Sequence, residues 1–223
     1  MLHDFHTHTC LSDGALSPCE LIRRAAVAGY ACIALTDHTG RGSLARILAE
    51  LRADCDLARA HWGLRALAGV ELTHVPPQAI PALAREAREL GAEIVVVHGE
   101  SPVEPVAAGT NRAAVSCRDV DILAHPGLLT AEEAALAAAN GVFLELSARG
   151  GHNMANGLVA SLARAAGARL LVDSDAHAPA DLLTTAKAKM VALGAGLTAE
   201  ESDGCLETSP GILLDRLSGC SSV

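Results

Sequence analysis

Short apolar runs alternate with longer stretches rich in Ala, Leu and Arg through most of the sequence. The apolar runs resemble buried parallel strands. We place them near residues 2–6, 31–36, 66–71, 92–98, 121–125, 142–147 and 169–174. This alternation favours a parallel sheet with helical crossovers. Seven such units are enough to close a barrel slightly smaller than the eight-stranded type, and an open doubly wound sheet is the alternative architecture.

The segments between these runs carry helix start and stop signals. Ser17-Pro18 is a cap followed by a first-turn proline, and Gly29 ends the same segment. Glu132 and Glu133 stand in the first turn of another helix, which suits the helix dipole. Helices are expected at 18–29, 43–60, 78–90, 111–118, 130–140, 153–166 and 179–193, with one or two more over 198–218 and a frayed tail at 219–223. The 223 residues suit a single barrel domain.

Composition limits the classes of function. The formal net charge is −9, and the chain has one Trp, one Tyr and two Phe. The negative net charge disfavours binding to the phosphate backbone of a nucleic acid, and few aromatic side chains are available to stack on bases. We therefore expect no nucleic-acid partner. The seven cysteines form no C-x-x-C pair, no basic-then-apolar leader opens the chain, and no apolar run approaches a membrane span. We therefore expect free thiols in a cytoplasmic protein with no membrane contact.

Potential metal ligands stand at the end of each expected strand. The carboxyl ends of parallel strands converge on one face, where barrel enzymes build their sites. Taken singly, each of these residues is explained as well by a structural histidine or a strand-end charge. The joint pattern predicts a metal centre. Its expected ligands are His6, His8, Asp13, His38, Glu71, His98, His125, Asp175 and His177.

The types of these side chains narrow the class of metal. Mixed imidazole and carboxylate ligands suit Zn, Mn, Fe or Co and disfavour Ca. Nine ligands exceed the needs of one ion, so we expect two or three divalent transition metals, with Glu71 placed to bridge two of them. No cysteine belongs to the set, which argues against a closed structural zinc site.

The ordered set His6-x-His8, Asp13, Asp37-His38, Glu71, His98, His125 and Asp175-x-His177 resembles the PHP (polymerase and histidinol phosphatase) superfamily over residues 3–180. The resemblance implies a distorted (β/α)7 barrel with a two- or three-metal site. The segments from Val97 to Glu100 and from Ser147 to Asn153 are similar to the stand-alone, histidinol-phosphatase-like members.

Carried over by position, the family pattern implies three groups of ligands. His6, His8, Glu71 and Asp175 would hold one ion. Glu71 would bridge to a second ion, which His98 and His125 also bind. Asp13, His38 and His177 would hold a third. No expected ligand is missing, so the pattern is not that of a degenerate copy.

A metal-activated hydroxide attacking phosphorus in line is the expected mechanism. Asp175 or His177 could relay a proton to the leaving group. Four further side chains are candidates to bind the substrate phosphate or its surroundings: Arg149, Arg112, Arg41 and His152. Glu100 could orient a ligand imidazole, whereas His3, His61 and His74 are expected to be structural or surface residues.

Hydrolysis of a small phosphomonoester is the leading hypothesis. A phosphodiesterase or nuclease acting on nucleotides or short nucleic acids uses the same chemistry, but the acidity counts against it. A non-catalytic, metal-stabilised binding module is the alternative from another class, and the intact ligand set counts against it. Hydrolysis of a C–N or C–O bond is the fourth hypothesis. The sequence does not indicate the metal, the substrate or the oligomeric state.

Overall fold

The apolar runs form parallel strands that neighbour one another in chain order. This computed structural model describes residues 1–219, and its sheet has the order β1-β2-β4-β5-β6-β7-β8, with β3 paired to β4. The strands are β1 (Leu2–Asp4), β2 (Tyr30–Leu35), β3 (His38–Thr39), β4 (Arg65–Leu72), β5 (Ile94–His98), β6 (Ile122–Ala124), β7 (Phe143–Ser147) and β8 (Leu170–Asp173). All seven predicted strands are present. The two-residue strand β3 was not predicted because it has no apolar run of its own.

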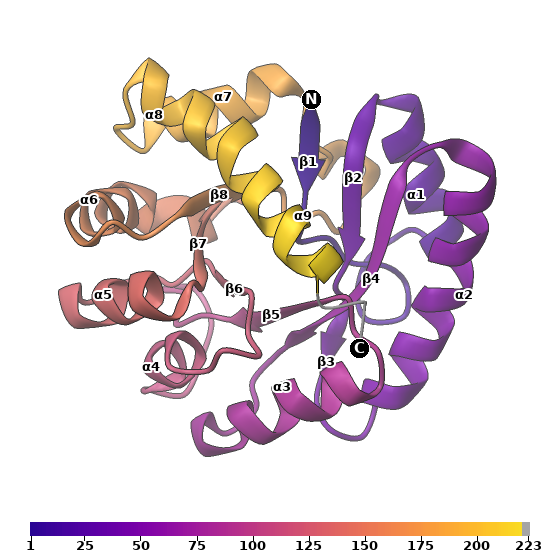
Figure 1. Cartoon of the computed structure of the whole chain (residues 1–223), viewed down its shortest axis with the longest axis horizontal. Helices are drawn as coiled ribbons and strands as arrows, with labels where there is room; N and C mark the ends of the chain where they lie inside the picture. Colours follow the sequence, from indigo (N-terminus) through magenta and orange to yellow (C-terminus); the bar gives the residue numbers. More distant parts are fainter. Residues whose placement is uncertain (220–223) are drawn as a thin grey trace.

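The two ends of the sheet meet between β1 and β8, so the sheet closes into a distorted barrel. This seam contains one parallel bridge, Thr7 to Ala176. Next to this bridge, aspartate side chains provide hydrogen bonds where a strand ladder would have backbone carbonyls. Asp173 Oδ1 accepts from the Phe5 amide at 2.7 Å, and Asp4 Oδ1 accepts from the Ser174 amide at 3.0 Å. The predicted distorted (β/α)7 barrel is confirmed, and its distortion lies at this seam (Figure 1).

Helices surround the strands on their outer side (Figure 1). They are α1 (Pro18–Val27), α2 (Leu44–Trp62), α3 (Ile80–Glu89), α4 (Thr110–Val115), α5 (Ala131–Asn140), α6 (Asn156–Ala166), α7 (Thr185–Gly194), α8 (Ala199–Asp203) and α9 (Ser209–Gly219). Two of these helices have side-chain N-caps where the sequence predicts helix starts. The Ser17 hydroxyl accepts from the Glu20 amide, and Thr130 forms a capping box with Glu133. A π-helical turn, Gly204–Thr208, joins α8 to α9. Gly219 ends α9 instead of beginning a tail, and the rest of the expected tail, 220–223, lies outside the described residues.

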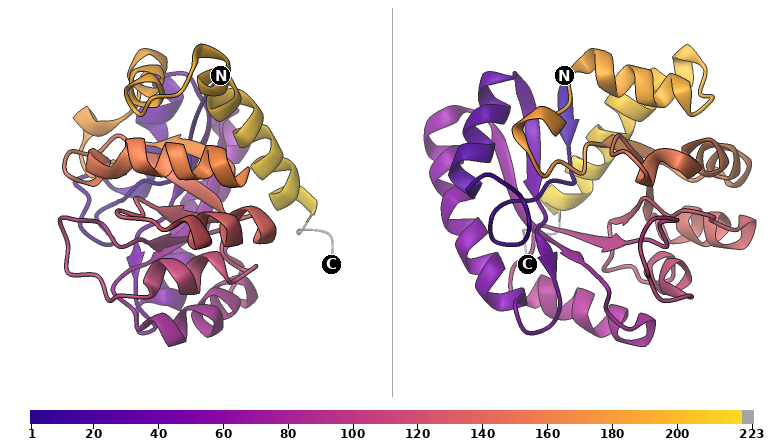
Figure 2. Two further views of the ribbon diagram at one scale, coloured as in Figure 1. Left: turned by 90° about the vertical axis from the view of Figure 1, so that its left-hand side faces the viewer. Right: turned by 180° about the vertical axis from the view of Figure 1, so that it is seen from behind.

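The barrel has an inner and an outer apolar layer. The inner layer includes Phe5, Leu67 and Phe143, and the outer layer fills the space between the strands and the helices. Helix α9 adds Leu213 to the inner layer. Its Arg216 donates to Asp121, which directly precedes β6, so α9 covers the amino ends of the strands. Figure 2 shows this helix along one edge of the molecule.

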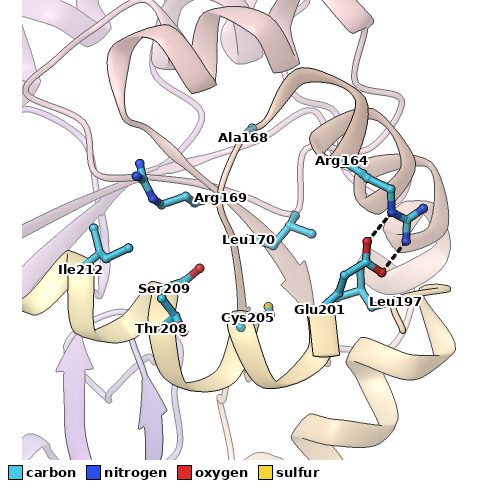
Figure 3. A pocket seen from close by; sticks show the side chains of 11 residues that line it. Arg164, Ala168, Arg169, Leu170, Leu197, Glu201, Cys205, Thr208, Ser209 and Ile212 are labelled. Carbon is cyan, nitrogen blue, oxygen red and sulfur yellow. Dashed lines mark hydrogen bonds and ion pairs between the residues drawn. The ribbon is translucent and has the colours of Figure 1, made fainter. Parts of the chain in front are cut away.

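The opposite ends of the strands are therefore the ones left free for a site. A surface hollow beside α6 and α9 is lined by the Arg164–Glu201 ion pair, Arg169 and Cys205 (Figure 3). Because Arg169 directly precedes β8, this hollow lies toward the amino ends of the strands. Within residues 1–219, no helix combines the length and apolarity that crossing a membrane requires.

Candidate metal centre

The nine predicted ligands lie at the carboxyl ends of the strands or in the loops that follow them. Most of them are buried, and Asp13 is the exposed member. Five groups of imidazole and carboxylate atoms, each with all its atoms within 4.8 Å of one another, occur in the described part of the chain, and four of the five share members. Overlap between groups is the arrangement expected for neighbouring metal positions that share ligands.

The most deeply buried group contains the two histidines that follow β1. The Nε2 atoms of His6 and His8 lie 3.0 Å apart. Glu71 Oε1, from β4, lies 3.3 Å from His6 Nε2, and Asp175 Oδ1 lies 3.2 Å from His8 Nε2. The structure thus brings together the four residues expected to bind the first ion.

His125 joins the same group from the other side. Its Nε2 atom is 3.6 Å from Glu71 Oε1 and 3.8 Å from Asp175 Oδ2. The His98 ring packs against the His125 ring with centroids 4.4 Å apart, but the His98 Nε2 atom faces Glu104 and His74. Of the expected second group, Glu71 and His125 are therefore brought together, and His98 is turned outward.

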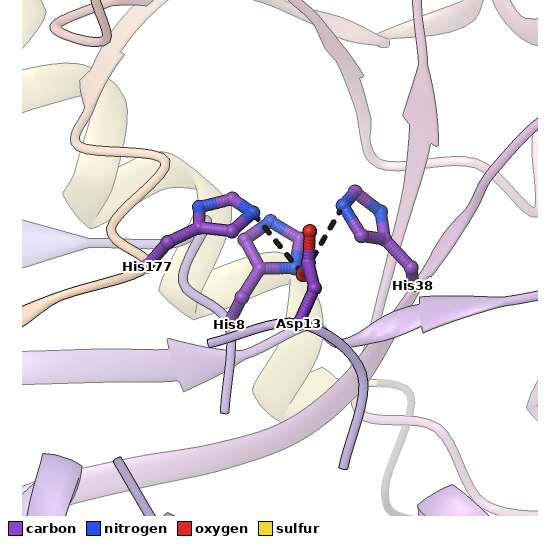
Figure 4. A group of neighbouring side chains, drawn as sticks. All are labelled: His8, Asp13, His38 and His177. Atoms are coloured by element: carbon purple, nitrogen blue, oxygen red, sulfur yellow. Dashed lines mark ion pairs between the residues drawn. The ribbon is translucent and has the colours of Figure 1, made fainter. Parts of the chain in front are cut away.

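The expected third group forms as a compact set with His8 at its base (Figure 4). Asp13 Oδ1 lies 3.2 Å from His177 Nε2 and 3.6 Å from His38 Nε2. The loop that carries Asp13 is fixed by Asp37, whose carboxylate accepts hydrogen bonds from the amides and hydroxyls of Thr9 and Ser12. The sequence pattern includes Asp37 only as the neighbour of His38 and does not predict this role in holding the loop.

The donor atoms of this cluster fit divalent ions. The His6 Nδ1 atom pairs with Glu145, so the neutral ring would present the lone pair of its Nε2 atom to an ion, in place of the hydrogen bond that Nε2 now makes with His8 Nε2. Buried Glu71 Oε1, His8 Nδ1 and His125 Nδ1 have no hydrogen-bond partner among the described residues. Unpaired buried polar atoms are costly and call for an explanation. A cation between Glu71 Oε1 and the facing Nε2 atoms of His6 and His125 would provide the partner that this carboxylate oxygen lacks.

The metal-free cluster contains groups of both charges. Burial lowers the pKa of His6 and His38, but the facing carboxylates outweigh burial and raise the pKa of His6 well above its usual range and that of His38 to about 9, so these two imidazoles must lose a proton to bind a metal. Burial raises the pKa of Glu71, but the facing His6 and His38 outweigh burial and hold it well below its usual range. Burial lowers the pKa of His8 to about 4 and that of His125 well below its usual range. Glu71 is therefore a carboxylate and the imidazoles of His8 and His125 are neutral near pH 7, which are the protonation states that metal ligation requires.

Glu145, in β7, contacts a predicted metal ligand, and the sequence pattern gave it no role. Its Oε2 atom lies 2.7 Å from His6 Nδ1, and both side chains are fully buried. A carboxylate on the second nitrogen fixes the tautomer and the orientation of a ligand imidazole. The signal in the sequence was a single charge inside an otherwise apolar run.

The structure separates the four expected substrate-binding residues into two pairs. Arg149 lies at the cluster: its Nη1 atom is 2.8 Å from His177 Nδ1 and 3.2 Å from the Asp175 carbonyl oxygen. His152 is buried beside His125, with ring centroids 4.3 Å apart. Arg41 and Arg112 are not brought to the cluster. They form exposed ion pairs with Glu86 and Glu132, because Arg41 reaches α3 from the loop after β3 and Arg112, which lies on α4 and not in a loop, reaches α5.

Other expectations about neighbouring residues also change. Glu100 does not orient a ligand imidazole, because its Oε1 atom accepts from the Gly109 and Asn111 amides at the start of α4. His74, expected to be structural or on the surface, faces Glu104 at the edge of the cluster. The non-glycine residues with positive φ in the described chain are His74, His125 and Asp175, and all three belong to the groups above. Backbone strain of this kind clusters at functional sites.

Comparison with known proteins agrees with this geometry. Residues 4–141 match the PHP domain family. A Methanocaldococcus jannaschii protein described only as uncharacterized is 46% identical over 218 residues, which cover 97% of this chain and 100% of that protein.

Two solved structures share the fold at low identity. One is a chain of an archaeal ribonuclease P solved with mature tRNA, with a TM-score of 0.70, 17% identity, and coverage of 96% of this chain and 91% of that chain. The other is the histidinol phosphate phosphatase of Lactococcus lactis, solved with zinc, L-histidinol and phosphate. Its TM-score is 0.62 at 13% identity, covering 88% of this chain and 94% of that chain. Together with the family match and the M. jannaschii relative, the ordered ligand set places this chain in the PHP domain family.

Proposed function

We propose that the protein hydrolyses a small phosphomonoester with two or three divalent transition metals. The observation that carries the proposal is the convergence of the strand-end imidazoles and carboxylates beside the cationic side chain of Arg149. Zn, Mn and Fe all suit these ligand types. The histidinol phosphate phosphatase with the same fold was solved with zinc and phosphate, which supports the same class of metal and substrate here.

Three groups of side chains would hold the ions. His6, His8, Glu71 and Asp175 would bind the first, and Asp13, His38 and His177 the third. For the second, Glu71 and His125 are close together, while His98 would have to turn inward to complete it. Ions in these positions would act as Lewis acids on the phosphate oxygens and supply a nucleophilic water at neutral pH.

Arg149 would bind the phosphoryl group. Its Nη1 atom contacts His177 and the Asp175 carbonyl oxygen, and its Nε atom lies 3.7 Å from Asp175 Oδ2, so Nη2 is the nitrogen best placed to donate to phosphate oxygens. His152, buried beside His125, would form the adjoining wall. Arg41 and Arg112 have no part in this proposal.

Of the two relay candidates, His177 is the better one, and it would relay a proton only while it is not bound to the third ion. Burial raises the pKa of Asp175, but the facing His6 and His8 outweigh burial and hold it below its usual range. Asp175 therefore stays ionised at neutral pH and cannot donate a proton. His177 is partly exposed at the edge of the cluster, within reach of a leaving group.

The net charge of −9 supports a small substrate rather than a nucleic acid. The cysteines in the described residues are free thiols, which fits a reducing compartment such as the cytoplasm.

The test is an assay of the purified protein loaded in turn with Mn, Zn and Fe(II). The substrates are histidinol phosphate and other phosphomonoesters, a phosphodiester and short RNA, and His8→Ala is the control for contaminating phosphatase. Monoesterase activity that His8→Ala abolishes would support the proposal. Activity on diesters or RNA alone would replace it with the nuclease hypothesis. No turnover despite stoichiometric metal would contradict it.

A further inference from the structure

The surface hollow beside α6 and α9, here called the basal hollow, lies at the opposite end of the barrel from the metal cluster. Arg169 on its wall directly precedes β8, whereas Asp175 of the cluster follows that strand. The cavity volume is about 350 Å³, which is within the range of pockets that bind small molecules. No described residue of the metal cluster lines it. A ligand in the basal hollow would therefore not touch the bound metals.

Apolar side chains form much of the lining of the basal hollow. Leu170 begins β8, Leu197 lies in the turn before α8, and Ile212 lies on α9. The two leucines are largely buried by the protein itself, but Ile212 is 38% exposed. Apolar surface in a hollow favours a ligand that removes it from water. This wall therefore suits the apolar body of a small molecule.

Three polar side chains in the same lining have no protein partner. The guanidinium of Arg169 and the hydroxyls of Thr208 and Ser209 make no hydrogen bond or ion pair within residues 1–219. The chain has 26 acidic and only 17 basic side chains, yet none of the described acidic groups pairs with Arg169. Its charge is therefore available to a ligand. Hydrogen bonds from a guanidinium to an anionic group are among the strongest that a protein makes.

An ion pair closes the other side of the basal hollow. Arg164 Nε lies 2.6 Å from Glu201 Oε1, and Arg164 Nη2 donates to the Gly196 carbonyl oxygen. Because Arg164 compensates the Glu201 carboxylate, the remaining charge of the lining is the positive charge of Arg169. Figure 3 shows the Leu170 side chain between Arg169 and this ion pair. The uncompensated cation and the apolar wall are therefore adjacent.

The π-helical turn between α8 and α9 supplies the third wall. Gly204, Cys205 and Thr208 of this turn line the basal hollow, and Ser209 follows them directly. No atom lies within 4 Å of the position that a Cβ of Gly204 would occupy, so this part of the wall is open. π-helical turns are rare and occur frequently at functional sites. The turn is thus a second, independent observation that points to a binding site here.

We propose that the basal hollow is a second binding site, which takes a small organic anion with one acidic group and an apolar body. The guanidinium of Arg169 and the two unpaired hydroxyls bind the acidic group. The wall formed by Leu170, Leu197 and Ile212 covers the apolar body. Carboxylates, sulfonates and phosphates share the anionic chemistry that this site recognises. The inference goes beyond the proposed hydrolysis and does not depend on it.

The first test is isothermal titration calorimetry with octane-1-sulfonate, an apolar anion that is not a phosphate ester. We expect one molecule to bind, and the uncharged octan-1-ol to bind at least about tenfold more weakly. Arg169→Gln removes the cation, and Ile212→Glu places a carboxylate in the lining, so each should weaken the sulfonate by about tenfold or more. Arg46→Gln and Leu158→Glu are matched controls at exposed positions outside the hollow, and they should bind it as the wild type does.

The same titration on chelator-treated protein with octanoate and octyl phosphate compares the two biological acidic groups. Binding of either one that Arg169→Gln weakens supports the proposal, and the tighter of the two identifies the acidic group of the ligand.

Three results would overturn the proposal: no binding of octane-1-sulfonate to the wild type, equal affinity in the wild type and both hollow variants, or equal affinity for the sulfonate and octan-1-ol. The unfolding temperature without ligand shows whether each variant is folded. His8→Ala separates this proposal from the proposed function, because it should lose hydrolysis but keep the wild-type affinity for octane-1-sulfonate. A weaker affinity in His8→Ala would place the anion at the metal cluster and contradict the basal site.

The second test locates the ligand by hydrogen exchange of a peptide covering residues 204–212, which includes the π-helical turn. Octane-1-sulfonate should slow exchange of this peptide in the wild type and in Arg46→Gln, but not in Arg169→Gln. Slowing confined to a peptide covering residues 149–155, beside the metal cluster, would show that the anion binds at the other end of the barrel and would contradict the proposal.

Discussion

At the scale of single residues, the hydrogen bonds on the far side of each imidazole decide what the candidate centre can bind. Glu145 holds His6 Nδ1, and the Gly99 carbonyl oxygen holds His98 Nδ1. Each contact leaves Nε2 as the free donor atom and fixes the direction of the ring. The ligand atoms are therefore aimed before any ion arrives, which reduces the ordering that binding requires.

Replacing Glu145 tests this orientation. Glu145→Gln keeps the size of the side chain but removes the charge that favours the His6 Nδ1 proton. We expect metal affinity and kcat to fall by about 10- to 100-fold, the range seen for such outer partners. Competition with a chromogenic chelator measures the affinity, and the exposed Glu200→Gln is the control. An unchanged affinity would contradict the positioning role.

Replacing Arg149 tests the phosphate contact. A charge-assisted hydrogen bond contributes about 1.5–3 kcal/mol, so Arg149→Ala should lower kcat/KM by roughly 10- to 150-fold. Arg41→Ala and Arg112→Ala are matched controls, because these arginines pair with surface glutamates, and their kcat/KM should stay within about twofold of the wild type. Equal losses in all three variants would argue against a specific phosphate contact by Arg149.

The sequence predicted which ligands gather but not what holds them. Convergence of His6, Glu71 and Asp175 follows from a parallel barrel, because strand ends share one face. The partners Glu145 and Glu104 depend on side-chain direction within β7 and on the path of a long loop, and neither has a periodic signal. Arg41 and Arg112 were misplaced because the expected position along the chain does not determine where a long side chain points, and Arg112 lies on α4 and not in a loop.

At the scale of secondary structure, the seam between β1 and β8 is the least regular part of the barrel. Asp4 and Asp173 replace ladder hydrogen bonds there, and both are fully buried. Burial raises the pKa of Asp4 to about 7, and burial together with Asp4 raises the pKa of Asp173 well above its usual range. The metal-free seam therefore favours protonated carboxyl groups.

This seam predicts a pH dependence of stability. Between the usual pKa of 3.8 and the folded value of about 7, the native protein binds the Asp4 proton more tightly than the unfolded chain. Its contribution is present in full below pH 3.8 and is lost as the pH rises through about 7. Urea unfolding of chelator-treated protein should thus show a decline over this range that is smaller in Asp4→Asn. Parallel curves for the two proteins would contradict the raised pKa.

The regular elements were the most predictable part of the fold. Apolar runs of strand length predicted the seven strands, and capped segments with helical periodicity predicted most helices, to within a few residues. The sequence lacked a signal for β3, which is stabilised by its pairing with β4. Nor did it indicate that α9 would cover the barrel end, because that contact depends on residues far apart in the chain, such as Arg216 and Asp121.

At the scale of the whole molecule, the candidate centre joins side chains from the segment after β1, from β3 and β4, and from the segment after β8. Ions bound there would cross-link distant parts of the chain in the native state only. The free energy of metal binding therefore adds to the free energy of unfolding.

Metal loading should raise the unfolding temperature. Free ion at 100 times its Kd adds about 2.7 kcal/mol per site, and for a chain of this size that corresponds to roughly 5–10 °C. Differential scanning calorimetry with Zn(II), with and without chelator, measures the shift. His8→Ala should show a smaller shift, whereas an equal shift in this variant would indicate that the stabilising ions bind elsewhere.

The seam also sets an order of events while the protein is being made. Its paired residues, Phe5 and Asp173, are 168 positions apart, so the ribosome releases the first histidines long before Asp175 and His177. No nascent chain shorter than this can enclose an ion with the full ligand set. Complete enclosure of any ion by these ligands would therefore be a late step of maturation.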